Sequence, residues 1–401
     1  MAQSGGERQV MFEQRIVQAR LPRRNLLAAV AMATLAACAV VPKGPTPTTA
    51  PAPRPAPSGS QLPSDSQRHR IALLVPMSGV NGAVGQSIAN AATMAVMDTN
   101  AQNLRITNYD TSAGAASAAS RAIADGNQLI LGPLLADDIP AVAGVARAAK
   151  VPIISFSNDA DAAGLDVYVM GSLPGESIRR TVRYARGRGV TSFAALVPKG
   201  DYGERASAAL IAETRAAGGS LTAMESYDRS AASITAAASK LRGRGAVDAI
   251  LIADSGSLSA RAAGVLKPRG AASPRLLGTE LWSGEKALST SPSLEGAWFA
   301  AVSDTRFPQF VKSYRTRFGA APYRIATLGY DAVLLTLRVA RDWKPGRTFP
   351  TTSLTSPDGF LGLDGAFRFD RSGVINRAFE VREVSGGAVK VVSPAPTKFG
   401  N

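Results

Sequence analysis

The side chains that most often carry covalent chemistry are scarce in this chain of 401 residues. It has one cysteine, Cys38, and one histidine, His69, which falls at the end of a segment that we expect to be a linker. Serine-histidine-aspartate and cysteine-histidine systems both need a histidine held in a folded site. A zinc site made of histidine and cysteine needs several such ligands. We therefore expect no catalytic residues, no metal and no cofactor.

Two local patterns resemble enzyme or nucleotide-binding motifs, but both lack the companions that the chemistry needs. Ser283 and Lys286 fit the S-x-x-K pattern of penicillin-recognising enzymes, yet the K-T-G motif is absent and one such match is expected by chance. Gly79, Gly82 and Gly85 follow a predicted strand, but their spacing fits neither a dinucleotide motif nor a P-loop. These patterns indicate a non-enzymatic protein without a nucleotide site.

The lone cysteine follows an export signal. Several arginines precede a short apolar run, Leu26 to Leu35, which is followed by two alanines and Cys38. Such a pattern is typical of a secretory signal, and the run is too short for the roughly 20 residues of a membrane span. It resembles the bacterial lipobox, which implies that residues 1–37 are a signal peptide and that Cys38 becomes the lipidated first residue. The alternative is an ordinary cleavable signal. By resemblance to lipoprotein sorting, Ala39 implies an anchor in the outer membrane, facing the periplasm of the cell envelope.

Residues 38–69 are predicted to form a tether. Eight prolines lie between Pro42 and Pro63 among small and polar residues, a composition that favours extended chain and cannot form a core. The formal charge of +15 falls to about +12 without the signal peptide. An exported protein does not meet nucleic acid, so we expect acidic envelope polymers or lipid headgroups as counterparts of this charge. An arginine-rich solvated surface is the alternative.

Beyond residue 70, strand and helix patterns alternate, which predicts an α/β fold with parallel sheets. The first series has strands at 71–75, 104–109, 128–131 and 152–155 and helices at 86–98, 115–125 and 137–150. The second has helices at 176–186, 203–217 and 233–242 and strands at 193–197, 221–227 and 249–252. The tail has a helical stretch at 324–342 and antiparallel strands at 365–370 and 377–384. The restart of the series predicts two lobes, with a hinge near 171–176.

Five short motifs stand near the ends of the predicted elements. They are Val75-Pro-Met-Ser-Gly79, Gly132-Pro133, Val151-Pro-Ile-Ile-Ser155, Tyr202-Gly203 and Gly329-Tyr-Asp331. In this order they resemble the type 1 periplasmic binding proteins, the leucine-binding-protein-like family. The resemblance implies a domain over 70–396 with two lobes, each a parallel sheet flanked by helices, joined by hinge crossovers. The first lobe would comprise about 70–172 plus 303–345, and the second about 173–302 plus 346–396.

The resemblance implies a ligand site in the cleft loops, beyond the carboxyl ends of the strands. The residues that we expect to line it are Ser78, Asn81, Leu134, Ala136, Ser157, Asn158, Tyr202, Ser255 and Glu280. Amino-acid importers of this family offer donors to the ligand carboxylate from two of these loops. Here the loops carry Asp137, Asp138 and Asp159, whose charge disfavours a carboxylate. The alternative for Asp137 and Asp138 is helix capping, and Tyr202 could instead serve packing.

The sequence leaves two functions open. The first is a non-catalytic envelope lipoprotein that resembles the activators of penicillin-binding proteins and regulates a peptidoglycan synthase, which the altered carboxylate loops favour. The helical-repeat domain of the best-known activators has no counterpart in residues 39–69. The alternative is a solute-binding lipoprotein that delivers an amino acid or a related small molecule to an ABC permease. Tyr202-Gly203 and the two-lobed body favour this alternative.

Overall fold

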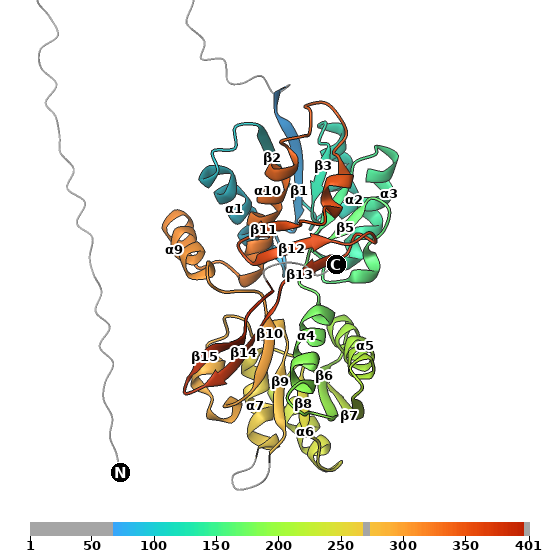
Figure 1. Ribbon diagram of the computed structural model, residues 1–401. Coiled ribbons are helices and arrows are strands. Elements are labelled where there is room, and N and C mark those ends of the chain that lie inside the picture. The colour runs from blue at the N-terminus through green and yellow to red at the C-terminus, as the bar shows by residue number, and fades with distance from the viewer. Residues whose placement is uncertain (1–66, 268–272, 397–401) are drawn as a thin grey trace, which may run out of the picture. The chain divides into compact units, whose positions relative to one another are not determined.

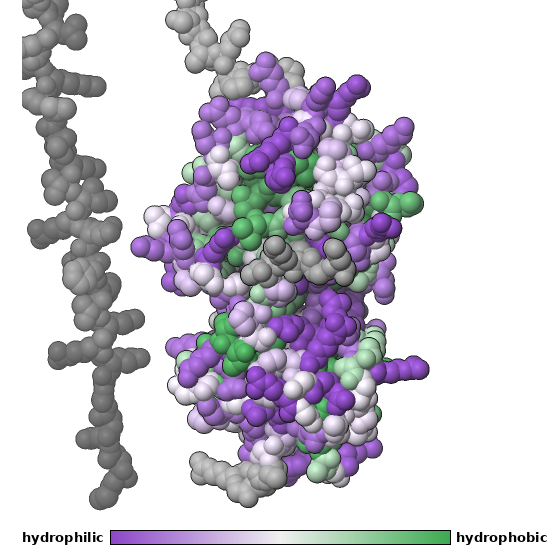
Figure 2. Space-filling view, in the orientation of Figure 1, coloured by the Kyte–Doolittle hydropathy of each residue, from purple (hydrophilic) through white to green (hydrophobic). Residues whose placement is uncertain are grey.

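The computed structural model describes residues 67–267 and 273–396. These residues belong to one compact unit, Gln61–Asn401. The predicted signal peptide, Cys38 and nearly all of the tether lie outside the described residues. Within the described ranges, no helix combines the length and apolar character that a bilayer span requires. On the face shown in Figure 2, hydrophilic side chains predominate and separate the hydrophobic areas from one another.

The first lobe is built on a five-stranded parallel sheet in the order β2-β1-β3-β4-β5 (Figure 1). The strands are β1 (His69–Val75), β2 (Leu104–Asp110), β3 (Leu129–Leu131), β4 (Ile153–Ser155) and β5 (Val167–Val169). Its helices are α1 (Gly82–Asp98), α2 (Ala115–Ala124), α3 (Ile139–Ala148), α9 (Phe307–Phe318) and α10 (Thr327–Val339). Ile71 and Leu73 of β1 pack in the core with α1 and α10, whereas Leu74 packs in the core with α2 and α3. The alternation of a buried strand thus gives the sheet two covered faces.

The second lobe is built on a seven-stranded sheet in the order β15-β14-β10-β9-β8-β6-β7. Its parallel strands are β6 (Ser192–Pro198), β7 (Ser220–Tyr227), β8 (Ala249–Ile252), β9 (Arg275–Gly278) and β10 (Trp298–Ala301). Two antiparallel strands, β14 (Glu380–Ser385) and β15 (Ala388–Ser393), extend it at one edge. Helices α4 (Pro174–Arg186) and α5 (Asp201–Ala216) cover one face, and α6 (Ala231–Arg242), α7 (Gly256–Leu266) and the short α8 (Ala287–Thr290) cover the other. The predicted two-lobed α/β fold is confirmed.

The division of the C-terminal third between the lobes differs from the prediction. A three-stranded sheet, formed by β11 (Phe360–Gly362), β12 (Gly365–Phe369) and β13 (Ile375–Arg377), packs on the first lobe. Phe367 and Ile375 share the first lobe's core with Phe349 and Leu354, and Phe369 makes an edge contact with Tyr168 at 5.6 Å between ring centroids. The assignment of residues 346–377 to the second lobe was therefore wrong, because their apolar side chains are buried in the first.

The strand predicted at 377–384 is two strands in two different sheets. β13 ends at Arg377 in the first lobe, and β14 begins at Glu380 in the second. The apolar pattern runs on without a break because the connecting residues, Ala378 and Phe379, are themselves buried. No turn residue marks this crossing in the sequence.

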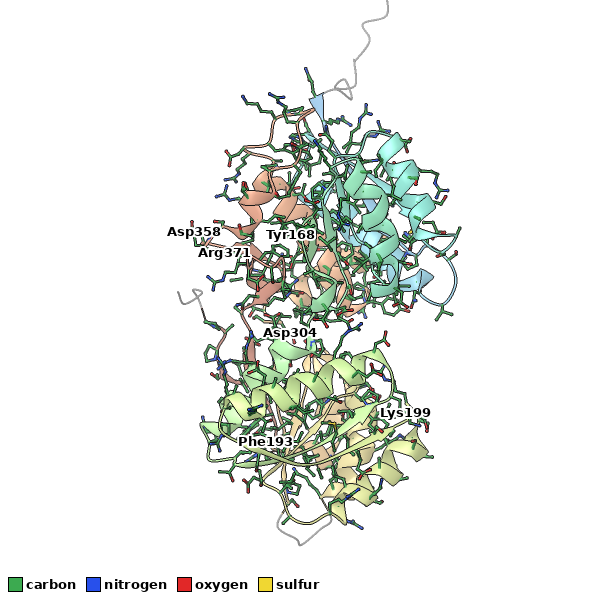
Figure 3. The ribbon with its side chains drawn as sticks, turned by 90° about the vertical axis from the view of Figure 1, so that its right-hand side faces the viewer. Tyr168, Phe193, Lys199, Asp304, Asp358 and Arg371 are labelled. Carbon is green, nitrogen blue, oxygen red and sulfur yellow. The ribbon has the colours of Figure 1, made fainter. Side chains whose placement is uncertain are left out.

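Three chain segments connect the lobes. They follow β5, β10 and β13, and cover residues 170–173, 302–306 and 378–379. The first lies beside the predicted hinge at 171–176. Figure 3 shows Asp304 of the second segment at the level where the two lobes meet.

We expected His69 in the tether, but it lies in the folded body. It is the first residue of β1, is 2% exposed and stacks on the Trp343 ring at 4.0 Å between centroids. Burial lowers the pKa of His69. The tether as predicted, 38–69, is therefore too long by this residue.

Candidate functional site

A cavity of about 560 Å³ lies between the lobes, at the carboxyl ends of strands from both sheets. The first lobe contributes residues after β1, β3 and β4, such as Asn81, Leu134 and Asn158. The second lobe contributes Tyr202 at the start of α5 and Glu280 after β9. A ligand-binding site is expected in this position in an open α/β architecture.

Six of the nine predicted residues line this cavity. They are Asn81, Leu134, Ala136, Asn158, Tyr202 and Glu280. The three predicted serines do not line it, because each holds its own loop. Ser78 Oγ donates to Asp110, Ser157 Oγ accepts from the Asp159 amide, and Ser255 caps the first turn of α7.

Local backbone geometry fixes the position of Tyr202 and Glu280. A Cβ at Gly203 would lie 1.6 Å from the Pro198 carbonyl oxygen, so glycine is required where α5 begins close against β6. A Cβ at Gly278 would lie 2.2 Å from the Trp282 ring. That ring is buried under the turn at 280–282, which carries Glu280. These close contacts hold both cavity-lining side chains on rigid elements.

The two side chains form the best-defined polar contact of the cavity. Tyr202 Oη donates to Glu280 Oε1 at 2.9 Å and lies 2.9 Å from Thr279 Oγ1. Glu280 Oε2 is buried and has no hydrogen-bond partner among the described residues. Burial raises the pKa of Glu280 to about 7, although the hydroxyl groups of Tyr202 and Ser177 offset part of this effect. The Ser177 hydroxyl donates its own hydrogen bond to the Ala300 carbonyl at 2.7 Å. One carboxylate oxygen is therefore held in place while the other is unsatisfied, which is costly without a partner.

Arg205 changes the electrostatics that the sequence suggested. Its Nη2 lies 3.0 Å from Asp159 Oδ2 and its Nη1 donates to Asn158 Oδ1 at 3.1 Å, so Asp159 is neutralised within the protein. Asp159 and Asp138 are not among the residues that line the cavity, whereas Asp137 is. The expectation that all three acids face the ligand is therefore wrong. Arg205 was missed because helical spacing alone does not show which residue of α5 reaches across to the other lobe.

A second arginine in the cavity wall, Arg324, was also missed. Its Nη1 donates to Asp364 Oδ1 at 2.8 Å, and its Nη2 lies 3.3 Å from Asp304 Oδ1. Burial disfavours its charge, but the two carboxylates outweigh burial and raise the pKa of Arg324. Its Nε is buried without a partner among the described residues. The sequence showed only that this residue begins a helical stretch.

The cavity wall is acidic on balance and otherwise apolar. It carries two guanidinium groups and five carboxylates, and the carboxylates belong to Asp137, Asp201, Glu280, Glu285 and Asp364. The apolar part comes mainly from Val84, Leu134, Leu135, Phe156, Leu281, Ile325, Leu328 and Phe379. Within the described residues, no group of three or more histidine, cysteine or acidic side chains could hold a metal ion. The wall therefore suits an organic solute with a cationic group and an apolar body.

Two lobes joined by three segments around one cavity define a protein of the two-lobed ligand-binding class. A family profile of periplasmic binding proteins matches residues 69–388, and the chain belongs to this family. Membership implies a location in the periplasm or the cell envelope.

Solved structures share this fold at low sequence identity. A Rhodospirillum rubrum protein described as a branched-chain amino acid ABC transporter is 22% identical, with a TM-score of 0.70 over 81% of this chain and 100% of that one. The leucine-binding protein LivK of Thermotoga maritima is 21% identical, with a TM-score of 0.62 over 81% and 98%. A solute-binding protein of Rhodopseudomonas palustris in complex with benzoate is 18% identical, with a TM-score of 0.62 over 82% and 98%.

Among curated proteins, an uncharacterized protein of Rickettsia prowazekii is 29% identical over 139 residues. The match covers 34% of this chain and 37% of that protein. At this coverage it carries no statement about activity.

Proposed function

We propose that this protein is a non-catalytic solute receptor of the cell envelope. Its ligand is a small organic cation with an apolar body, which binds in the cavity between the lobes and is passed to an ABC permease. The single observation that carries the proposal is the buried, unpartnered Glu280 Oε2 in an acidic, otherwise apolar cavity. A cationic group placed there would satisfy the carboxylate and return it to its ionised form.

Regulation of a peptidoglycan synthase, our first expectation from the sequence, is the less favoured function. It rested on three acids opposed to a ligand carboxylate, and one of them, Asp159, is paired with Arg205. The similar structures are solute-binding proteins of ABC transporters. The described residues also contain a lined cavity of a size that suits a small molecule.

We further propose that the receptor is a lipoprotein whose anchor is the Cys38 thioether, with residues 39–68 as its tether. A tether of about 30 residues, at roughly 3.1 Å per extended residue, lets the body work up to ~90 Å from its anchor, toward a permease in the inner membrane. Retention in the outer membrane is part of the same proposal and follows from Ala39.

The test of the ligand class is a calorimetric titration with leucinamide and with leucine. Both carry an ammonium group and the same apolar side chain, but only leucine brings a carboxylate. We expect leucinamide to bind at least tenfold more tightly, because Asp137 and the other wall carboxylates oppose a second anion. Tighter binding of leucine would contradict the cation class, and the absence of binding by either probe would contradict the receptor.

Variants separate the site from the rest of the domain. Glu280→Gln removes the charge while keeping the shape, and should weaken leucinamide binding at least tenfold. Glu204→Gln is the matched control, since Glu204 is exposed on α5 only two residues from Tyr202 and does not line the cavity. An equal loss in both variants would show that Glu280 does not hold the ligand.

A further inference from the structure

A second cavity, of about 1130 Å³, lies at the other end of the second lobe. It is formed by segments that precede β6, β8 and β9, so it opens at the amino ends of the parallel strands. It shares no lining residue with the cavity between the lobes. The proposed solute site therefore leaves this second cavity unexplained.

The lining of this cavity is strongly basic. Five cationic side chains line it, at Arg188, Arg242, Arg244, Lys267 and Arg275, against a single carboxylate, Asp248. Asp248 Oδ2 already accepts hydrogen bonds from the amides of Thr191 and Ser192, each at 2.8 Å, and from the Thr191 hydroxyl at 2.7 Å. The Asp248 carboxylate is therefore already hydrogen-bonded to the residues at the start of β6.

Four of the five cations have no ion-pair partner among the described residues. Arg244 pairs with Glu225 at 2.9 Å, but Arg188, Arg242, Lys267 and Arg275 form no ion pair with any residue in the described ranges. We call these four residues the basic pocket. A set of unpaired cations around one hollow is a favourable place for an anion.

Neutral partners hold the basic pocket in shape without removing its charge. Arg242 Nη1 donates to the Val265 carbonyl at 3.0 Å, Lys267 Nζ donates to the Glu295 carbonyl at 2.7 Å, and Arg275 donates to the Gly296 carbonyl. The guanidinium of Arg275 also lies 4.2 Å from the centroid of the Trp298 ring. Cation–π contacts and carbonyl bonds orient a guanidinium but leave its net charge in place.

The cations of the basic pocket disfavour one another. The pKa of Lys267 is lowered, first by burial and then by the charge of Arg275. An anion between these two side chains would relieve the repulsion and raise the pKa of Lys267. The floor beneath them is apolar and includes Leu241 and Leu266. Water therefore competes less with an anion there than on an open surface.

We propose that the basic pocket is a binding site for the phosphate group of an organic phosphate ester. Phosphate presents several acceptor oxygens and up to two charges, which matches three guanidinium groups and one ammonium group better than a single carboxylate does. The apolar floor accommodates part of the organic residue that carries the phosphate. The ester is either a soluble molecule or the headgroup of an anionic phospholipid.

The experiment uses the full mature chain and three probes. Glycerol 3-phosphate and inorganic phosphate are titrated by calorimetry, and vesicles of phosphatidylglycerol are compared with vesicles of phosphatidylcholine by co-sedimentation. Binding of glycerol 3-phosphate in solution identifies a soluble ester, whereas binding only to phosphatidylglycerol vesicles identifies a lipid headgroup. Failure of all three probes overturns the proposal.

The variants decide whether binding occurs in the basic pocket. The double substitution Arg242→Gln with Lys267→Gln should weaken binding of the active probe at least tenfold. Arg215→Gln with Arg261→Gln is the charge-matched control, because Arg215 and Arg261 are exposed on α5 and α7 and do not line the pocket. An equal loss in the control would show general charge attraction and overturn the proposal. Glu280→Gln should leave phosphate binding unchanged, so this test is independent of the solute site.

Discussion

The side chain of Glu280 is fixed in position, and its carboxyl group changes protonation state near neutral pH. With its pKa raised to about 7, a large share of the ligand-free protein carries a neutral carboxyl group at neutral pH. The ionised form alone attracts a cation. Binding of a cationic solute must then compete with protonation at this residue.

We therefore expect affinity for leucinamide to increase with pH between 5.5 and 7. Below the pKa of Glu280, each pH unit should weaken binding about tenfold, and above about pH 7.7 binding should weaken again because the α-amino group of leucinamide loses its proton. Titrations in two buffers with different heats of ionisation should show proton release on binding near pH 7. In Glu280→Gln the pH dependence below pH 7 should disappear, and a dependence that persists in this range would assign the proton to another group.

Cys38 carries the prediction about anchoring. Cys38→Ala should release the protein from the membrane fraction or leave its signal peptide uncleaved, because no other thiol is present for lipidation. Phase separation in detergent, followed by immunoblotting, measures the partition. If Cys38→Ala partitions with membranes as the unaltered protein does, the chain is anchored in another way.

Among the elements, β13 controls the connection between the lobes. The amide of Arg377 donates to Glu176 Oε1 at 2.7 Å, and its Nη2 donates to the Met170 carbonyl at 3.0 Å. Its Nη1 lies 4.0 Å from the buried Asp331 carboxylate. One residue thus ties the third connecting segment to the first and to α10.

Arg377→Ala should lower the free energy of unfolding by about 3 kcal/mol or more, because it leaves the buried Asp331 carboxylate without its cation. Denaturant titration followed by circular dichroism measures this change. Arg371→Ala is the control, since Arg371 is exposed in the turn between β12 and β13 (Figure 3) and should change stability by no more than about 0.5 kcal/mol. Similar stability of the two variants would show that the Arg377 contacts are incidental.

Local patterns predicted most of the elements up to β8 except β5, but beyond β8 they missed α7, β9, β10 and α9. The helix expected at 115–125 is α2 (Ala115–Ala124), and the strand expected at 249–252 is β8, because apolar spacing and flanking glycines act over a few residues. The placement of β11 to β13 depends on contacts such as that of Phe369 with Tyr168, about 200 positions away in the sequence. No local pattern contains that information.

Contacts between residues distant in sequence also limited the prediction of the cavity between the lobes. Tyr202 and Glu280 were expected in the cleft from the family resemblance, and Tyr202 also follows a predicted strand, where the architecture puts ligands. The strand before Glu280, β9, was not predicted. Arg205 and Arg324 could not be predicted, because their roles depend on carboxylates contributed by distant segments. The charge of the cavity was therefore misjudged from the sequence.

On the scale of the whole molecule, several acids are more easily protonated in the folded chain than in the unfolded one. Burial raises the pKa of Glu176 and of Glu280 to about 7, and burial with the nearby Asp364 raises that of Asp331. Between about pH 4.5 and 7 the folded state binds more protons at these groups, so stability falls as pH rises through this range. Burial lowers the pKa of His69, so its contribution makes the folded state more stable as pH rises toward 6.5.

We expect the three acids to outweigh the one histidine, so the ligand-free protein should have a higher Tm at pH 5.5 than at pH 8. Scanning calorimetry across this range measures the effect. Glu176→Gln should reduce the difference, because glutamine cannot ionise at either pH. A Tm that rises steadily from pH 5.5 to 8 would contradict the assignment of raised pKa values to these acids.

The three connecting segments also constrain the order in which the chain can fold during synthesis. The first lobe's core joins Ile71 of β1 with Ile375 of β13, so it cannot close until β13 has left the ribosome. Contacts this distant in sequence form slowly. If the chain crosses the membrane unfolded, as the proposed signal peptide implies, this delay favours export, because the first lobe lacks part of its core until β13 has been made.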